Sequence, residues 1–175
     1  MYYIGFDLGS SSVKAALIDV KTGKSVGVTH YPETEMAIVA EQIGWAEQDP
    51  NLWWKNICEV TKKLLTETGI SSNKIKGIGI AYQMHGMVVV DKNNKVLRPS
   101  IIWCDSRAVE IGNTAFKEAG NDKCVSNLLN SPGNFTLSKL KWVKENEPEI
   151  FEKVAKLLLP GDFIALKLTG EATTT

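Results

Sequence analysis

The sequence has few of the residues that bind transition metals or form disulfides. It contains two histidines, His30 and His85, and three widely spaced cysteines, Cys58, Cys104 and Cys124. Because they form no C-x-x-C or H-E-x-x-H pattern, we expect no transition-metal site. Isolated cysteines favour free thiols, which are typical of a reducing compartment. The sequence therefore predicts a cytoplasmic location.

The sequence also lacks an excess of charge and a long apolar run. Lys and Arg together number 20, as do Asp and Glu, so the formal net charge is zero. The basic surplus of proteins that bind nucleic acid or anionic membranes is missing. No apolar run approaches the length that spans a bilayer, and no basic segment precedes the first one. We expect neither nucleic acid nor a membrane as a partner.

The residues that are present suffice for a folded core, since 43% of the 175 are hydrophobic. Apolar patterning predicts strands at residues 2–6, 13–20, 25–31, 76–81 and 86–91, with a short one around residue 96. Asp49 and Pro50 begin a helix that Gly69 ends. Further helices are expected at residues 136–146, 149–158 and 161–168. Because tight turns join the first three strands, we expect an α/β fold with an antiparallel opening sheet and a helix-rich second half.

The first candidate site is the segment I-G-F-D-L-G-S-S-S-V-K, where a strand ends in Asp7 and a turn of small residues follows. A carboxylate there can face Mg²⁺, which keeps several waters beside one or two carboxylates. Backbone N–H groups and hydroxyls of such a turn can donate to phosphate oxygens. The candidate phosphate-binding residues are Gly9, Ser10, Ser11, Ser12 and Lys14.

The same segment is open to a plainer interpretation as a hairpin turn, because Asp, Gly and Ser are common turn residues. The sequence has no G-x-x-x-x-G-K-[ST], and the pair Gly77 and Gly79 lacks the third glycine of a G-x-G-x-x-G. Any nucleotide site is therefore of neither the P-loop nor the dinucleotide-binding kind.

The second candidate site is Gln83-Met84-His85-Gly86, between two predicted strands. A histidine at a strand end can hydrogen-bond a substrate hydroxyl through either ring nitrogen. The alternative is a structural histidine in a connecting turn.

The third candidate site is the segment W-C-D-S-R, in which Trp103 offers an aromatic wall. Asp105 can accept hydrogen bonds from two neighbouring hydroxyls while Arg107 holds its carboxylate in place. The alternative is a helix start, with Asp105 or Ser106 as the N-cap and Arg107 on the surface. Of the nearby tryptophans, Trp53 has helical periodicity and is expected in the core, and Trp45 is left open.

Read together, these segments resemble the FGGY family of carbohydrate kinases, and most closely its xylulokinases. The similarity is collinear and also includes G-W-A-E-Q-D-P-x-x-W-W, F-T-L-S-K-L-K-W and P-G-D-F-I-A-L-K-L-T-G-E. Three places depart from the family pattern. Ala81-Tyr82 stand where Ser-Gly is usual, Cys104 replaces Asn, and Asn134 replaces Gly. The departures beside the sugar segments bear on which sugar is bound.

The resemblance implies an actin-like, ribonuclease H-like fold that transfers the γ-phosphate of ATP to a terminal hydroxyl of an open-chain sugar. By motif position, Asp7 takes the catalytic role of holding Mg²⁺ and phosphate. Met84 and His85 contact the sugar, and Trp103 and Asp105 form its wall. D-xylulose is the favoured substrate. The rivals are gluconokinase or ribulokinase specificity, and a sugar-binding module that transfers no phosphate.

The family's catalytic aspartate and its adenosine-binding lobe lie downstream of the T-G-E segment, which ends here at Glu171. Residues 1–175 are therefore expected to be the N-terminal domain of a longer kinase, without its C-terminal ATP-binding lobe and inactive alone. A homodimer of the full-length protein is left open.

Overall fold

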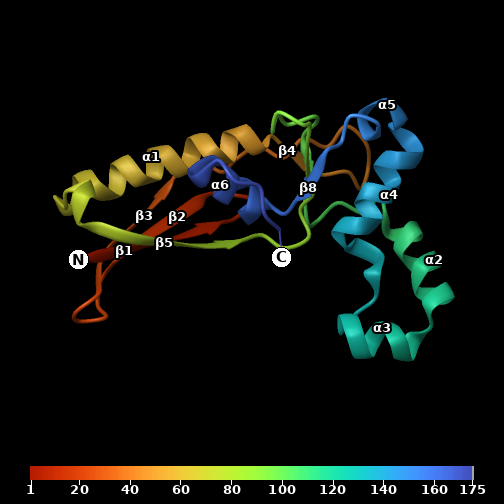
Figure 1. Cartoon of the computed structure of the whole chain (residues 1–175), viewed down its shortest axis with the longest axis horizontal. Helices are drawn as coiled ribbons and strands as arrows, with labels where there is room; N and C mark the ends of the chain where they lie inside the picture. The colour runs from red at the N-terminus through yellow and green to blue at the C-terminus, as the bar shows by residue number, and fades with distance from the viewer. Residues whose placement is uncertain (175) are drawn as a thin grey trace.

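The computed structural model describes residues 1–174, which form a mixed sheet, a long helix and a group of shorter elements (Figure 1). Four strands make the main sheet in the order β3-β2-β1-β5: β1 (Tyr2–Leu8), β2 (Val13–Asp19), β3 (Ser25–Tyr31) and β5 (Ile75–Tyr82). The first three pair antiparallel, as predicted, and β5 lies parallel to β1. Alternating burial along β1 and β2 shows that one face of this sheet lies against the core, because each strand directs every second side chain inward.

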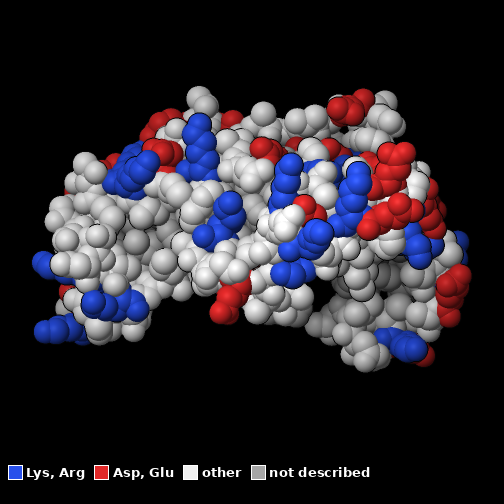
Figure 2. Space-filling model, turned by 45° about the horizontal axis from the view of Figure 1, so that its top comes forward, with Lys and Arg blue, Asp and Glu red and all other residues white. Residues whose placement is uncertain are grey.

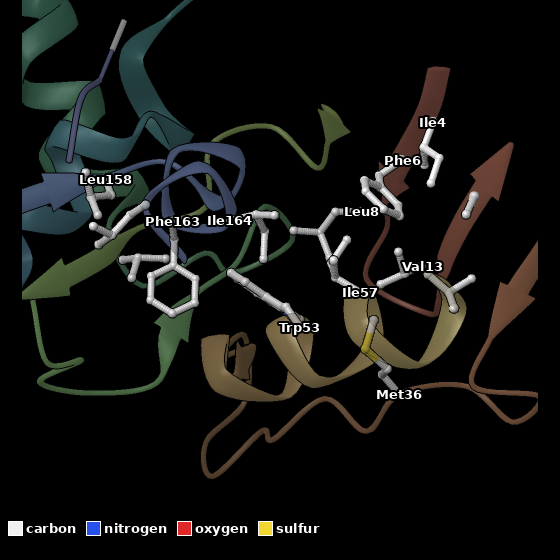
Figure 3. Close-up of a cluster of buried hydrophobic side chains, with 14 of the residues drawn as sticks. Ile4, Phe6, Leu8, Val13, Met36, Trp53, Ile57, Leu158, Phe163 and Ile164 are labelled. Atoms are coloured by element: carbon white, nitrogen blue, oxygen red, sulfur yellow. The ribbon is translucent and has the colours of Figure 1, made fainter. Parts of the chain in front are cut away.

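Helix α1 (Pro50–Thr68) covers one face of the sheet. The Asp49 side chain accepts a hydrogen bond from the backbone N–H of Asn51, and Gly69 ends the helix at φ 66°. The predicted start and end are confirmed. Trp53 is fully buried, as expected, and meets Ile57 and the sheet residue Leu8 in the cluster of Figure 3.

Helix α6 (Pro160–Thr169) joins the same core through Phe163 and Ile164 (Figure 3). It lies so close to the end of β5 that a Cβ on Gly161 would stand 2.0 Å from the Tyr82 ring. Only glycine fits this contact. It fixes the end of β5, from which the Gln83–Gly86 segment departs.

The second half is built from shorter elements. Two small antiparallel sheets pair β4 (Glu47–Gln48) with β7 (Ser100–Ile101), and β6 (Val88–Val90) with β8 (Lys156–Leu158). The remaining helices are η1 (Ser72–Lys74), α2 (Val109–Ala119), α3 (Asn121–Leu128), η2 (Pro132–Asn134), α4 (Thr136–Asn146) and α5 (Pro148–Phe151). Figure 1 places α2 to α5 together, at the end of the molecule away from the N-terminus.

Two predicted elements differ from the structure. The helix expected at residues 149–158 is wrong: α5 ends at Phe151, and Lys156–Leu158 is a strand. That strand pairs with β6, whose residues are all buried, and this distant partner overrides the local helical periodicity. The strand expected around Val96 is reduced to a single bridge with Val90.

The surface carries both signs of charge. On the face drawn in Figure 2, basic and acidic side chains are interspersed. Among residues 1–174, no helix has the length and apolarity needed to cross a membrane.

Candidate functional site

The candidate phosphate turn lies between β1 and β2, where Asp7 and Lys14 face each other in register. Their side chains are 55% and 64% exposed, and the Asp7 carboxylate lies 3.9 Å from the Lys14 ammonium. The Gly9 N–H donates to the Ser12 carbonyl oxygen at 3.1 Å, and a Cβ on Gly9 would approach that oxygen to 3.2 Å. The turn is therefore tight, and it presents one acidic and one basic side chain to its surroundings.

Hydrogen bonds from other segments fix the carbonyl groups of this turn. The Ser10 oxygen accepts from the Gln48 side chain at 2.6 Å, and the Ser11 oxygen accepts from the Met36 N–H at 2.7 Å. Within residues 1–174, the N–H groups of Ser10 and Ser11 have no acceptor. A rigid turn with free donors can bind an anion such as phosphate.

A magnesium ion fits this turn better than a transition metal does. Among the described residues, no three His, Cys, Asp or Glu side chains gather as a metal cluster. Asp7 offers an exposed carboxylate near the end of β1, just before this turn. One carboxylate suits Mg²⁺ because that ion takes its other ligands from water and phosphate oxygens.

The segment Gln83–Gly86, called the sugar loop below, leaves β5 beside this turn. The Gln83 N–H donates to the Leu8 carbonyl at 2.8 Å, so the loop begins where β1 ends. Gln48 links this loop to helix α1, because its Oε1 accepts from the Trp53 indole at 3.1 Å and from the Gln83 amide at 3.5 Å. Sequence reasoning missed Gln48, although it lies in the quoted G-W-A-E-Q-D-P segment.

His85 lies in this loop at φ 60° and stacks on the Phe135 ring, with centroids 4.8 Å apart and planes 19° apart. Burial, and then the charge of Lys139, lower the pKa of His85 below its usual 6.5. A neutral imidazole offers one donor and one acceptor to a ligand. Met84 is exposed next to it, and both line a cavity of about 490 Å³ that also includes Leu137.

The segment Trp103–Arg107, called the tryptophan loop below, contacts the turn through Trp103. Trp103 is half-exposed, and its indole N–H donates to the Ser10 hydroxyl at 3.4 Å. Asp105 is 1% exposed, and its Oδ2 accepts from the Ala46 N–H at 2.6 Å. Its carboxylate therefore faces the protein interior.

The alternative of a helix cap in the tryptophan loop is wrong. Helix α2 begins after Ala108, so neither Asp105 nor Ser106 is its N-cap. The Arg107 side chain is 1% exposed rather than on the surface, and it holds the Asp105 carboxylate at 2.7 Å. The sequence prediction that Arg107 fixes this carboxylate is confirmed.

Arg107 is the centre of a buried ionic network. It also binds Glu47 at 2.7 Å, and its guanidinium lies 3.7 Å from the Trp45 ring centroid. Arg98 joins Glu47 to Glu147, whose pKa is raised mainly by burial. Trp45 therefore packs on the buried guanidinium of Arg107 and helps to hold the tryptophan loop in place.

Lys139 is the second residue that sequence reasoning missed. It is 0% exposed, and its ammonium donates to the carbonyl oxygens of His85 at 2.8 Å and Ile102 at 2.9 Å. Burial is the main cause that lowers its pKa to about 8. A signal was present, because Lys139 lies four residues before Val143 on the buried face of α4.

The sheet order, with three antiparallel strands and a parallel fourth, and the phosphate turn after β1 define the actin-like ATPase class of fold. The sequence profile of the FGGY family of carbohydrate kinases, N-terminal domain, matches residues 2–175. The chain therefore belongs to the FGGY family of carbohydrate kinases.

Individual relatives agree with this assignment. The chain is 38% identical over 170 residues to a xylulose kinase of Escherichia coli K12, covering 97% of this chain and 34% of that one. A xylulose kinase of Bacillus subtilis is 36% identical over 176 residues, covering 97% and 33%. The chain thus spans about a third of the length of these relatives.

Solved structures show the same likeness. A Brucella ovis structure titled as a "xyloylose kinase" matches with a TM-score of 0.87 and 38% identity, covering 98% of this chain and 35% of that one. A gluconate kinase from Lactobacillus acidophilus matches with a TM-score of 0.83 and 27% identity, covering 98% and 34%.

Proposed function

We propose that the full-length protein phosphorylates an open-chain pentulose, D-xylulose, with magnesium-bound ATP as the phosphate donor. The observation that carries this proposal is the meeting of two kinds of loop at one edge of the sheet. The sugar loop begins at the end of β1 through the Gln83–Leu8 hydrogen bond, and Trp103 reaches the phosphate turn through Ser10. A sugar hydroxyl and a phosphate held there would be neighbours.

In this proposal Asp7 holds the metal, which supplies charge neutralisation on the phosphates. The turn residues Gly9, Ser10, Ser11, Ser12 and Lys14 orient the phosphate oxygens. Phosphoryl transfer depends mainly on such positioning and charge stabilisation. The base that takes the proton of the attacking hydroxyl, and the adenosine site, are proposed to lie outside residues 1–175.

On the sugar side, Met84 and His85 contact the substrate, and Trp103 forms a wall. The buried carboxylate of Asp105 contributes through the position of the tryptophan loop, because its oxygens are already bonded to Ala46 and Arg107. The free cysteines Cys58, Cys104 and Cys124 support a cytoplasmic location for this reaction.

The second candidate is phosphorylation of gluconate, supported by the gluconate kinase among the similar structures. Release of ADP by the full-length protein, measured with D-xylulose, L-ribulose and D-gluconate at matched concentrations, separates these functions. We expect the highest kcat/KM with D-xylulose. A higher value with gluconate or L-ribulose would overturn the choice of sugar. No ADP release with any sugar would favour the alternative of a sugar-binding module that transfers no phosphate.

A further inference from the structure

A single segment of the chain contacts both loops of the candidate sugar site. The Asn134 side chain donates to the Trp103 carbonyl oxygen, the Phe135 ring stacks on His85, and Lys139 donates to the carbonyls of His85 and Ile102. We call Asn134, Phe135 and Lys139 the loop anchor. Its members lie within six positions of one another at the start of α4, so they act on the two loops from one rigid base.

Lys139 is the member of the loop anchor with the most unusual environment. Its ammonium has no exposure and contacts two neutral carbonyl oxygens, at 2.8 and 2.9 Å. The neighbouring groups Asp105 and Cys104 favour its protonation, and Arg107 opposes it. A buried cation is costly to desolvate, and an apolar residue of similar size is often as stable. Stability alone therefore gives no reason for a lysine here.

The backbone that Lys139 contacts has an equally unusual conformation. His85 has φ 60°, a left-handed conformation that non-glycine residues rarely adopt. The Phe135 stack fixes the orientation of its ring, and Lys139 fixes its carbonyl. The bond to Ile102 extends the same constraint to the residue before Trp103. Ring and backbone of His85 are thus held by two residues one helical turn apart.

We propose that Lys139 is a positioning residue that holds the sugar loop and the tryptophan loop in the arrangement that binds the sugar, a role that rests on the proposed function. The phosphate turn is held by other residues, Gln48 and Met36. Removing the ammonium therefore loosens the sugar side of the site and leaves the phosphate side in place.

The test compares Lys139→Met with Lys141→Met in the full-length protein. Lys141 lies on the same helix, but its side chain is 60% exposed and pairs with Glu145. We expect Lys139→Met to raise the KM for D-xylulose at least tenfold while the KM for ATP changes less than twofold. The Lys141→Met variant should match the parent. An unchanged sugar KM, or an equal rise in both KM values, would overturn the proposal.

If the Lys139→Met protein fails to fold, a second variant and a second measurement still test the proposal. Phe135→Leu keeps an apolar side chain but removes the stacked ring, and it should raise the sugar KM with little change for ATP. If Phe135→Leu is folded and its sugar KM equals that of the parent, the proposed role of the loop anchor is wrong.

Hydrogen exchange separates this proposal from the proposed function. In the absence of any substrate, the loop anchor predicts faster amide exchange at residues 83–86 and 102–105 in the folded anchor variant, with residues 9–12 unchanged. That outcome holds even if the parent phosphorylates a different sugar or none. Unchanged exchange at both loops would contradict the role of Lys139 whatever the substrate proves to be.

Discussion

The phosphate turn and the two loops beside it use charged residues in opposite ways. At the turn, Asp7 and Lys14 are more than half exposed and only loosely paired, at 3.9 Å. In the tryptophan loop, Asp105 and Arg107 are buried and bonded at 2.7 Å. Lys139 of α4, which contacts the backbone at both loops, has no exposure either. The two regions are adjacent, since Trp103 bonds to Ser10.

The exposed charges of the turn are open to a ligand, whereas the buried charges are bonded to other parts of the protein. An exposed ion pair contributes little to stability, typically below about 1 kcal/mol, because water screens it. Removing one partner of a buried pair leaves a desolvated charge and costs about 3–5 kcal/mol. Substitutions on the turn should therefore affect turnover, and substitutions in the buried Asp105–Arg107 pair should affect folding.

The largest expected effect is that of Asp7→Asn on turnover. Asparagine keeps the size of the side chain but loses the charge that faces metal-bound phosphate. We expect kcat of the full-length protein to fall on the order of 1,000-fold, about 4 kcal/mol of transition-state stabilisation. Sugar affinity, measured by calorimetry, should be nearly unchanged. Loss of sugar affinity with turnover preserved at saturation would show that Asp7 acts in sugar binding and not in phosphoryl transfer.

The opposite balance is expected for Asp105→Asn. The change leaves Arg107 with Glu47 as its remaining carboxylate, and we expect the free energy of unfolding to fall by about 3 kcal/mol. Denaturant unfolding of the full-length protein measures this. Glu145→Gln, which removes an exposed partner of Lys141, is the control and should change stability by less than about 1 kcal/mol. Equal effects of the two variants would remove the distinction between buried and exposed charge.

The half of the molecule around the phosphate turn was the more predictable one. Every second residue of β1 is buried, and Asp49, Pro50 and Gly69 mark the ends of α1 through local hydrogen bonding and backbone geometry. Such signals act over a few residues, so the sequence alone shows them. The motifs also identified the turn and the two loops, although the roles of their residues remain predictions.

The sugar side was less predictable because distant partners determine it. The strand Lys156–Leu158 exists through its pairing with β6, and the burial of Arg107 depends on Glu47, sixty positions earlier in the chain. Lys139 lies in the quoted F-T-L-S-K-L-K-W segment, but the sequence does not show its contacts with the distant carbonyls of His85 and Ile102. Apolar periodicity in the sequence predicts which face of a helix or strand is buried. It does not predict which distant residues pack against that face.

His85 lies in the sugar loop, and its substitution should show the smallest of the three effects. Losing the imidazole removes a hydrogen-bonding partner of the sugar, at a cost of about 1–3 kcal/mol in sugar affinity. ATP affinity should change little. Because the pKa of His85 lies below 6.5, the imidazole is neutral at pH 7 and above. The contribution of the neutral imidazole to sugar affinity should therefore be constant from pH 7 upward and change only as acid protonates the ring. A fall in sugar affinity at alkaline pH would instead report deprotonation of Lys139, whose pKa is lowered to about 8.

Because His85 has a left-handed backbone conformation, two variants are needed to interpret a change in sugar affinity. At φ 60°, His85→Ala combines loss of the ring with a strained alanine, whereas His85→Gly removes the ring and adopts that conformation freely. If the imidazole contacts the sugar, both variants lose affinity by similar amounts in calorimetry with D-xylulose. If His85 only shapes the loop through its stack on Phe135, His85→Gly loses no more affinity than Phe135→Leu, which removes the same stack. The glycine variant therefore distinguishes a substrate contact from a structural histidine, which His85→Ala alone cannot do.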